Sequence, residues 1–325
     1  MLNPSKPALV LAPMDGITDA PMRDLMGRLG AFSYAVTEFI RVTTEPVPAK
    51  VFRREVPELL THGLTPSGLP VQVQILGGDA SAMALSAQNA VKAGAKSIDI
   101  NFGCPAPTVN RNDGGATLLK HPCRIEEIVR SVREAVSRDV SVSAKLRLGW
   151  ERIDDIYENA DRAAAGGASW LTIHARTRVQ GYSPPVFWAP IRRVREATGL
   201  PVIANGDIWC LDDFKQCREE ARVDHFMIGR SALARPELPH QIAMELGCAQ
   251  EPTVCTSWLE LLNHIASSLE NPKYAIMRLK QWIKLAHMHG DFPWFHDLKE
   301  CKSTDEFFAR LDSALKGSML EDVTA

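Results

Sequence analysis

Eight short apolar runs constrain the fold of this chain more than any other feature of its sequence. They begin at Ala8, Tyr34, Val71, Ser97, Ser141, Ser169, Pro201 and Asp224. Helix-like stretches lie between them, at 81–93, 123–137, 153–165 and 211–221, and glycines end several of these stretches, as at Gly94 and Gly166. Short buried strands that alternate with helices form parallel βαβ units. Eight such units predict a closed (β/α)8 barrel, although a doubly wound open sheet would alternate in a similar way.

The residues at the ends of the runs favour the barrel. A polar or conformationally special group follows nearly every run: Pro13-Met14-Asp15, Thr37-Glu38, Gln74, Asn101 with Cys104, Lys145 with Arg147, His174 with Arg176, Asn205-Gly206-Asp207, and Gly229-Arg230. Barrel active sites collect residues from the C-terminal ends of many strands, whereas an open sheet concentrates them at one crevice. We therefore expect an α/β TIM barrel over residues 1–247.

The chain changes character after Gly247. The β-branched runs stop, and helical patterns follow at 257–270, 273–289 and 304–316, with Pro272 and Pro293 between them. We expect a small, all-helical C-terminal domain over residues 248–325.

Composition excludes several classes of protein. The seven cysteines are odd in number and include no C-x-x-C pair, so neither a disulfide framework nor a metal site is expected. No secretion signal and no apolar run of membrane-spanning length is visible, which predicts a cytoplasmic protein without a membrane partner. The net charge of -2 argues against polyanion binding over the whole surface but permits a local basic face.

Cys104 is the candidate reactive residue. Ile98 and Ile100 suit a buried strand, and Gly103 and Pro105 end that strand around the cysteine, which holds the thiol on a rigid turn. Most free cysteines are simply small buried hydrophobes, and this alternative applies here too. The polar neighbours Asn101 and Asn110 favour a thiol displayed in a site.

A phosphate-bearing ligand is predicted at the ends of the last two strands. Asn205-Gly206-Asp207 follows the seventh run and Gly229-Arg230 the eighth, where barrels commonly build phosphate sites. Arg230 can add a charge-assisted hydrogen bond to the same phosphate.

Three further residues would converge on the barrel axis beside that phosphate. Gln74, Lys145 and His174 end the third, fifth and sixth runs. A cation and an amide donor suit the pyrimidine edge of a reduced flavin, which carries negative charge. The alternatives are a salt bridge from Lys145 to a carboxylate such as Asp99, and an ordinary hydrogen-bonded role for His174.

The chain resembles the tRNA-dihydrouridine synthases, flavin mononucleotide (FMN) enzymes that reduce one uridine of tRNA. The resemblance rests on APMDG (12–16), TEF (37–39), VQILG (73–77), DINFGCP (99–105), GGATLL (114–119), KLRLGW (145–150), IHART (173–177), VIANGDI (202–208) and MIGR (227–230). TEFIRV (37–42) and RLKQW (278–282) are similar to the C-type enzymes, which act on tRNA position 16. Phe102 departs from the family, which often has a cysteine there.

The resemblance implies a role for each candidate residue. FMN would be held by Pro13, Met14, Asp15, Gln74, Lys145, His174, Asn205, Gly206, Asp207, Gly229 and Arg230. NADPH would reduce the flavin, whose N5 would pass hydride to C6 of the uracil while Cys104 protonates C5. A thiol with a pKa of about 8.5 holds its proton at neutral pH, so Cys104 can act as a general acid without an activating base.

The helical pattern at 273–289 carries a candidate surface for tRNA. On a helical wheel, Lys273, Lys280, Lys284 and His287 share one face, which we call the basic stripe. A solvated face of an ordinary helix is the alternative. The resemblance implies that a flipped-out D-loop uridine enters the barrel and that a monomer contacts tRNA through Arg41, Asn101, Arg147, Tyr182, Arg278 and Lys280.

Two other functions remain open from the sequence. A flavin barrel acting on a free pyrimidine or an enone would share everything up to Gly247 but would leave the basic helix unexplained. A tRNA-binding folding protein with secondary catalysis would use the same helix and would not need Cys104.

Overall fold

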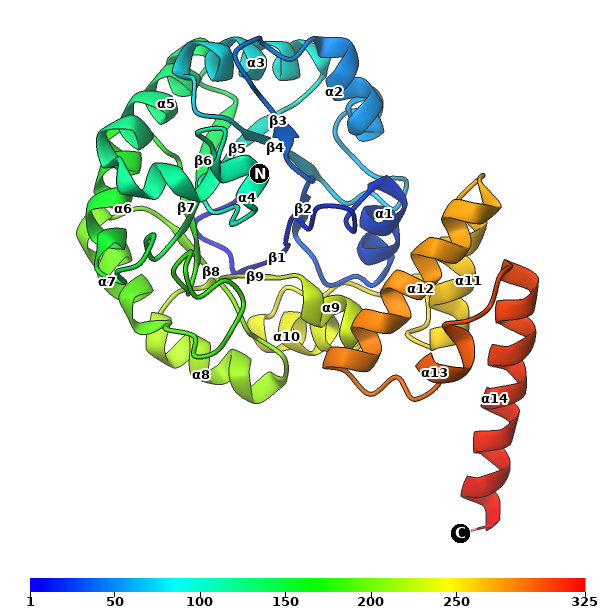
Figure 1. Ribbon diagram of the computed structural model, residues 1–325. Helices are drawn as coiled ribbons and strands as arrows, with labels where there is room; N and C mark the ends of the chain where they lie inside the picture. The colour runs from blue at the N-terminus through cyan, green and yellow to red at the C-terminus, as the bar shows by residue number, and fades with distance from the viewer. Residues whose placement is uncertain (325) are drawn as a thin grey trace.

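One parallel sheet closes on itself at the centre of the computed structural model, which describes residues 1–324, with side chains described through Lys316 (Figure 1). Its strands are β1 (Ala8–Leu11), β2 (Tyr34–Val36), β3 (Ile40–Arg41), β4 (Val71–Leu76), β5 (Ser97–Asn101), β6 (Ser141–Arg147), β7 (Leu171–His174), β8 (Val202–Asn205) and β9 (His225–Ile228). Strand β1 pairs with β2 on one side and β9 on the other, and β2 also pairs with β4. The predicted barrel is therefore confirmed, and the open sheet is excluded.

The second strand of the barrel is broken, which corrects the single strand expected from Tyr34 to Phe39. Strands β2 and β3 both pair with β4, so together they occupy one position in the barrel. The residues between them leave the ladder to make other contacts: Thr37 Oγ1 accepts a hydrogen bond from Gln74 N (3.0 Å), and Glu38 Oε1 accepts one from Ile17 N (2.9 Å). The break thus ties the loop after β1 to the second strand.

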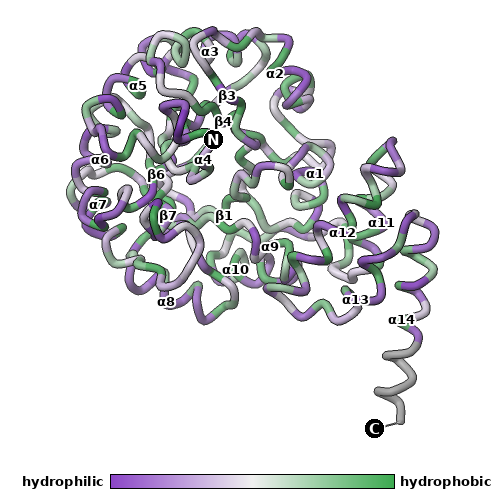
Figure 2. The backbone as a smooth tube through the Cα atoms, viewed as in Figure 1, coloured by the Kyte–Doolittle hydropathy of each residue, from purple (hydrophilic) through white to green (hydrophobic). Residues whose placement is uncertain are grey.

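Helices that lie between the strands or directly after the last strand surround the barrel. They are α1 (Ala20–Arg28), α2 (Ala49–Glu55), α3 (Ala80–Ala93), α4 (Pro107–Asn110), α5 (Pro122–Ala135), α6 (Asp155–Ala165), α7 (Ala189–Thr198), α8 (Leu211–Ala221), α9 (Arg230–Ala234) and α10 (Leu238–Leu246), with 3-10 turns η1 (Pro57–Thr61) and η2 (Gly115–Lys120). Hydrophilic residues are frequent along the outer helices in Figure 2. Local signals start several helices; Asp79, for example, caps α3 by accepting from Ala82 N at 2.7 Å.

Four further helices follow the barrel: α11 (Trp258–Ser267), α12 (Pro272–His289), α13 (Phe295–Leu298) and α14 (Thr304–Thr324). Helix α12 packs against α9, and Trp282 Nε1 donates to the carbonyl oxygen of Leu233 at 2.8 Å. Helix α14 points away from the barrel in Figure 1. No helix in the described part is long and apolar enough to cross a membrane.

Side chains alternate along the central strands and divide the interior from the outer core. On β4, Val73 and Ile75 belong to the large apolar core between strands and helices, while Gln72 and Gln74 are buried polar residues. Part of the barrel interior is apolar: Val10, Ala12, Tyr34, Val36, Trp170, Ile203 and Met227 form a separate cluster there. Strands β4, β5 and β6 supply the polar part, which leads toward the C-terminal ends of the strands.

Candidate active site

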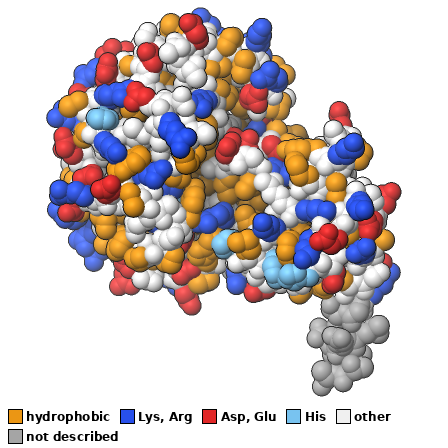
Figure 3. Space-filling model, in the orientation of Figure 1, with side chains coloured by type: hydrophobic (Ala, Val, Ile, Leu, Met, Phe, Trp, Pro, Cys, Tyr) orange, Lys and Arg blue, Asp and Glu red, His pale blue; other side chains and the backbone are white. Residues whose placement is uncertain are grey.

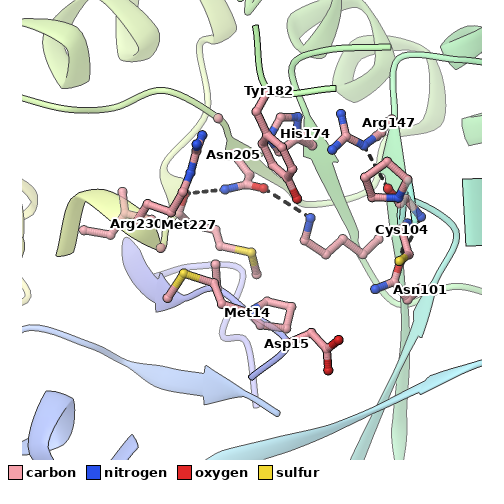
Figure 4. A pocket seen from close by; sticks show the side chains of 18 of the residues that line it. Met14, Asp15, Asn101, Cys104, Arg147, His174, Tyr182, Asn205, Met227 and Arg230 are labelled. Atoms are coloured by element: carbon pink, nitrogen blue, oxygen red, sulfur yellow. Dashed lines mark hydrogen bonds between the residues drawn. The ribbon is translucent and has the colours of Figure 1, made fainter. Parts of the chain in front are cut away.

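A cavity of about 560 Å³ opens at the C-terminal ends of the barrel strands. Its lining includes twelve residues predicted to act in catalysis or to hold a cofactor: Pro13, Met14, Asp15, Gln74, Cys104, Lys145, His174, Asn205, Gly206, Asp207, Gly229 and Arg230. Figure 4 shows side chains from across the barrel pointing into this one space. The structure therefore brings together the residues that the sequence distributed over many strand ends.

The loop that carries Cys104 is held by hydrogen bonds on several sides. Asn101 Oδ1 accepts from the backbone nitrogen atoms of Gly103 (2.8 Å) and Cys104 (3.0 Å). The Cys104 carbonyl oxygen accepts from Asn110 Nδ2 at 2.9 Å and from Ala116 N at 3.1 Å. Burial raises the pKa of the Cys104 thiol above its ordinary value, and the Asp15 carboxylate adds to this effect. The half-buried thiol is therefore protonated at neutral pH and faces the cavity.

Lys145 supplies a half-buried cation that lines the cavity. Its Nζ donates to Asn205 Oδ1 at 3.2 Å, and Asn205 Nδ2 donates to the Met227 carbonyl oxygen at 2.8 Å. The alternative salt bridge to Asp99 is not among the ion pairs of the described residues. Desolvation lowers the pKa of Lys145 to about 8, partly opposed by the charge of Asp99.

His174 lies beside Lys145 in a strongly cationic setting. It is 7 % exposed, and its Nδ1 has no hydrogen-bond partner among the described residues. Burial, followed by the charges of Arg147 and Lys145, lowers its pKa well below the ordinary value, so the ring is neutral. His174 thus lines the cavity as a neutral ring whose Nδ1 has no partner among the described residues.

Arg230 is placed by aromatic rings and by Asp207. Its guanidinium carbon lies 4.6 Å from the centre of the Tyr182 ring and 5.1 Å from that of Trp209, and its Nη2 is 3.5 Å from Asp207 Oδ1. Asp207 also forms a two-point ion pair with the fully buried Arg176. The Asp207 carboxylate thus orients arginine, so any contact of Asp207 with a phosphate would come from its backbone.

The residues predicted to contact tRNA separate into two groups. Asn101, Arg147 and Tyr182 line the cavity, whereas Arg41, Arg278 and Lys280 do not. Arg41 is exposed and donates to the Thr108 carbonyl oxygen at 3.4 Å, next to the Cys104 loop. Lys280 is half-buried on α12. These two residues are accessible, and their contacts with tRNA stay predictions.

Arg278 differs from the expectation. It is 2 % exposed, forms an ion pair with Asp19 (3.0 Å), and donates to the carbonyl oxygens of Gly16 and Ile17. The guanidinium therefore joins α12 to the loop after β1, and this position does not support the predicted contact with tRNA. A helical wheel could not show this, because it does not say which face docks on the barrel.

Lys273, Lys284 and His287 of the basic stripe are exposed, and Lys280 is half-buried. None of the four forms an ion pair among the described residues. Figure 3 shows Lys, Arg and His side chains over this C-terminal part, with acidic side chains among them.

Among the residues that the structure describes, the cysteines and the other potential metal ligands form no metal site. All seven cysteines are free thiols. Within the described residues, no group of three or more His, Cys, Asp or Glu side chains could hold a metal ion.

Comparison with known proteins decides the family. Residues 10–319 match the family described as dihydrouridine synthase (Dus). The chain belongs to the dihydrouridine synthase family. It is accordingly an oxidoreductase, as the resemblance of its motifs had indicated.

Several named relatives of this dihydrouridine synthase align over most of its length. A protein of Aquipseudomonas alcaligenes is 44 % identical over 283 residues, which cover 85 % of this chain and 89 % of the relative. One from Shewanella oneidensis is 41 % identical over 312 residues, covering 94 % and 98 %. One from Neisseria meningitidis serogroup A is 42 % identical over 283 residues, covering 86 % and 85 %. All three relatives carry the name tRNA-dihydrouridine(16) synthase.

Sequence reasoning missed three residues around Arg230. The sequence patterns indicate Arg176 only as a group at a strand end, and they do not indicate Trp209 or His289. Trp209 lines the cavity and stacks on His289 of α12, with ring centroids 4.6 Å apart. Trp209 directly follows the VIANGDI motif, and this position indicates that it lies at the cavity. Nothing in the sequence of α12 indicates that His289 stacks on Trp209.

Proposed function

We propose that this dihydrouridine synthase is a tRNA-dihydrouridine(16) synthase that uses FMN and NADPH to reduce the C5–C6 double bond of a flipped-out D-loop uridine. The names of its relatives support the substrate and the position. The observation that carries the chemistry is that a protonated thiol, Cys104, shares one cavity with the cations Lys145 and Arg230.

The residues of the cavity fit FMN. Its volume of about 560 Å³ lies within the usual range of cofactor sites. Gly229 lies so close to the end of the neighbouring strand β1 that an added Cβ would lie 3.0 Å from Met14 Sδ. Lys145, Gln74 and His174 offer a cation, an amide and a free ring nitrogen to the flavin ring, and Arg230 offers a cation to the phosphate. Pro13, Met14, Asp15, Asn205, Gly206 and Asp207 complete the proposed FMN site.

The chain's own chemical contribution is a proton. FMN held in this cavity, reduced by NADPH, would supply the hydride that adds to C6 of the uracil. The Cys104 thiol donates its proton to C5, because a thiol with a raised pKa remains protonated until it meets a stronger base. A proton and a hydride together saturate the double bond, and the Cys104 thiolate recovers its proton from solvent.

Access to the thiol requires that the uridine leave the stacked tRNA. Unstacking costs a few kcal/mol, which contacts to the tRNA backbone must offset. Asn101, Arg147 and Tyr182 at the cavity would receive the base, while Arg41 and Lys280 would bind outside it. We propose that residues 1–247 form the catalytic domain and 248–325 the tRNA-binding domain of a cytoplasmic monomer.

The test compares three proteins on unmodified tRNA with NADPH: the wild type, Cys104→Ala and Cys123→Ala. Cys123 is an exposed thiol on α5 and serves as the matched control. Mass spectrometry of the digested tRNA measures the gain of two hydrogen atoms at uridine 16. We expect the gain with the wild type and Cys123→Ala and its loss with Cys104→Ala, which should keep its flavin and its affinity for tRNA.

Other results would redirect the assignment. Reduction of free uridine or an enone at the same rate without tRNA would favour a small-molecule reductase. Undiminished reduction by Cys104→Ala would remove the thiol from the chemistry. Reduction at another uridine would change the position while leaving the reaction in place.

A further inference from the structure

Asp99 is a buried carboxylate that the proposed reaction does not use. It lies on β5 inside the barrel, is 2 % exposed and does not line the cavity. Its Oδ1 accepts from Ser143 Oγ at 2.5 Å, and its Oδ2 accepts from Gln74 Nε2 at 2.7 Å. Burying a charge here carries a desolvation cost that hydrogen bonds only partly offset, so the carboxylate calls for an explanation.

A chain of hydrogen bonds leads from Asp99 to the Cys104 loop. Gln74 Nε2 donates to Asp99 Oδ2, and Gln74 Oε1 accepts from Asn101 Nδ2 at 2.8 Å. The oxygen of Asn101 is then left to accept from the backbone nitrogen atoms of Gly103 and Cys104. The two amides therefore point the same way, each with its nitrogen toward the barrel interior and its oxygen toward the loop.

The Asp99 carboxylate and the two backbone N–H groups of the loop fix this direction from opposite ends of the chain. An ionised Asp99 can only accept hydrogen bonds, so Gln74 must turn its amide nitrogen toward Asp99. The amide oxygen of Gln74 is then left to accept from Asn101. The reverse arrangement would place the Asn101 nitrogen against two backbone N–H groups, donor against donor. Gln74 is fully buried and Asn101 is 8 % exposed, so water is poorly placed to replace a lost partner.

We propose that Asp99 is a positioning residue for Cys104, which acts by orienting the side-chain amides of Gln74 and Asn101 so that Asn101 holds the backbone of the cysteine loop. The importance of this role for turnover rests on the proposed function, in which Cys104 is the proton donor. The positioning itself is a property of the loop and can be measured without turnover.

The first experiment compares Asp99→Asn with Ser143→Ala in the flavin-loaded protein. The amide introduced by Asp99→Asn can donate to Gln74 as well as accept, so the amides are no longer held in one direction. Ser143→Ala removes one hydrogen bond to Asp99 but leaves the carboxylate facing Gln74, which makes it the matched control. The measurement is the rate at which iodoacetamide alkylates Cys104, followed by mass spectrometry of its peptide as a function of pH.

We expect Asp99→Asn to raise the alkylation rate roughly tenfold at every pH, because a loop that loses its acceptor opens more often. Ser143→Ala should stay within about twofold of the wild type. Loss of a charge would instead shift the midpoint of the pH curve and leave its height unchanged. A shifted midpoint alone, or equal rates in the two variants, would overturn the proposal.

A second variant covers the case in which Asp99→Asn does not fold. Gln74→Met is close in shape and breaks the chain between Asp99 and Asn101, so it should raise Cys104 alkylation by a similar factor. If Cys104 of Gln74→Met is alkylated at the same rate as Cys104 of the wild type, the proposal is contradicted.

Turnover provides a separate readout. At saturating tRNA, Asp99→Asn should lower kcat roughly tenfold with little change in KM, and Ser143→Ala should not. If Cys104→Ala proves fully active, the proposed function fails, while the alkylation result still decides whether Asp99 holds the loop.

Discussion

Asp99 and Lys145 show how burial changes two opposite charges in the same barrel. Desolvation raises the pKa of Asp99 to about 6, against the effects of hydrogen bonds from Ser143 and Gln74 and the charge of Lys145. Desolvation likewise lowers the pKa of Lys145 to about 8. Each group is thus less charged than it would be in water, and each remains mostly ionised at neutral pH.

This shift predicts how Asp99 contributes to stability as pH changes. Native Asp99 takes up its proton at a higher pH than the unfolded chain, where the pKa is about 3.9. Between these values the native state binds more protons, so the stabilising contribution of Asp99 decreases as pH rises. The unfolding free energy of the wild type minus that of Asp99→Asn should therefore fall from about pH 4 to about 6 and then level off.

Urea unfolding of both proteins across this range checks the prediction. Lys145, with a pKa of about 8, stays charged throughout and does not obscure the comparison. If the unfolding free energy of the wild type minus that of Asp99→Asn rises with pH, or does not change, the pKa of Asp99 is not raised in the folded protein.

At the scale of elements, loops from two strands and a C-terminal helix meet around Arg230. Tyr182 follows β7, Trp209 follows β8, and His289 ends α12. The rings of Tyr182 and Trp209 contact the Arg230 guanidinium, and His289 stacks on Trp209. The helix after the barrel therefore supports the cation that we assign to the FMN phosphate.

We expect Trp209→Ala to weaken FMN binding about tenfold, because a cation–π contact of up to about 2 kcal/mol is lost and Arg230 gains freedom. Titration of the flavin-free protein, followed by the quenching of FMN fluorescence, measures the affinity. His289→Phe keeps an aromatic stack on Trp209 and should bind FMN nearly as the wild type does. If Trp209→Ala binds FMN with the affinity of the wild type, the contact of Arg230 with the Trp209 ring does not contribute to FMN binding.

At the scale of the whole molecule, cations gather in two places although the net charge is only -2. The cavity combines Lys145, Arg147 and Arg230, and the basic stripe adds lysines on α12. Arg278 is the exception on this helix, because it is buried and joins α12 to the barrel. Helix α12 thus carries solvated lysines, which we propose bind tRNA, and one internal arginine that attaches the helix to the barrel.

The two roles predict different results on substitution. Replacing Lys273, Lys280 and Lys284 together by Ala should weaken tRNA binding and reduce the slope of log K against log salt by about 0.7–0.9 for each lost phosphate contact. Stability and flavin content should not change. Arg278→Ala should instead lower the unfolding free energy by about 3 kcal/mol, since Asp19 and the carbonyl oxygens of Gly16 and Ile17 lose the buried guanidinium.

Binding isotherms at several salt concentrations and urea unfolding separate these effects. An unchanged salt slope in the triple variant would exclude the basic stripe as a phosphate-binding surface. Normal stability of Arg278→Ala would contradict its role in attaching α12.

The barrel and most of the lining of its cavity follow from the amino-acid sequence alone. Strand and helix periods are local properties, and the ends of parallel strands must meet at one edge of a closed sheet. Placing Gln74, Lys145, His174 and Asn205 at strand ends was therefore enough to predict that they converge. The Gly and Pro beside Cys104 similarly identified its loop from local geometry.

The partners of these residues could be found only from the folded chain. The break between β2 and β3, the burial of Arg278, the stack of Trp209 on His289 and the hydrogen-bond chain from Asp99 all join segments that are distant in sequence. A periodic pattern shows which residues share a face, but the docking of that face depends on the shape and polarity of what lies opposite. For that reason the sequence predicts Arg278 to be a surface cation, whereas the fold buries it between α12 and the barrel.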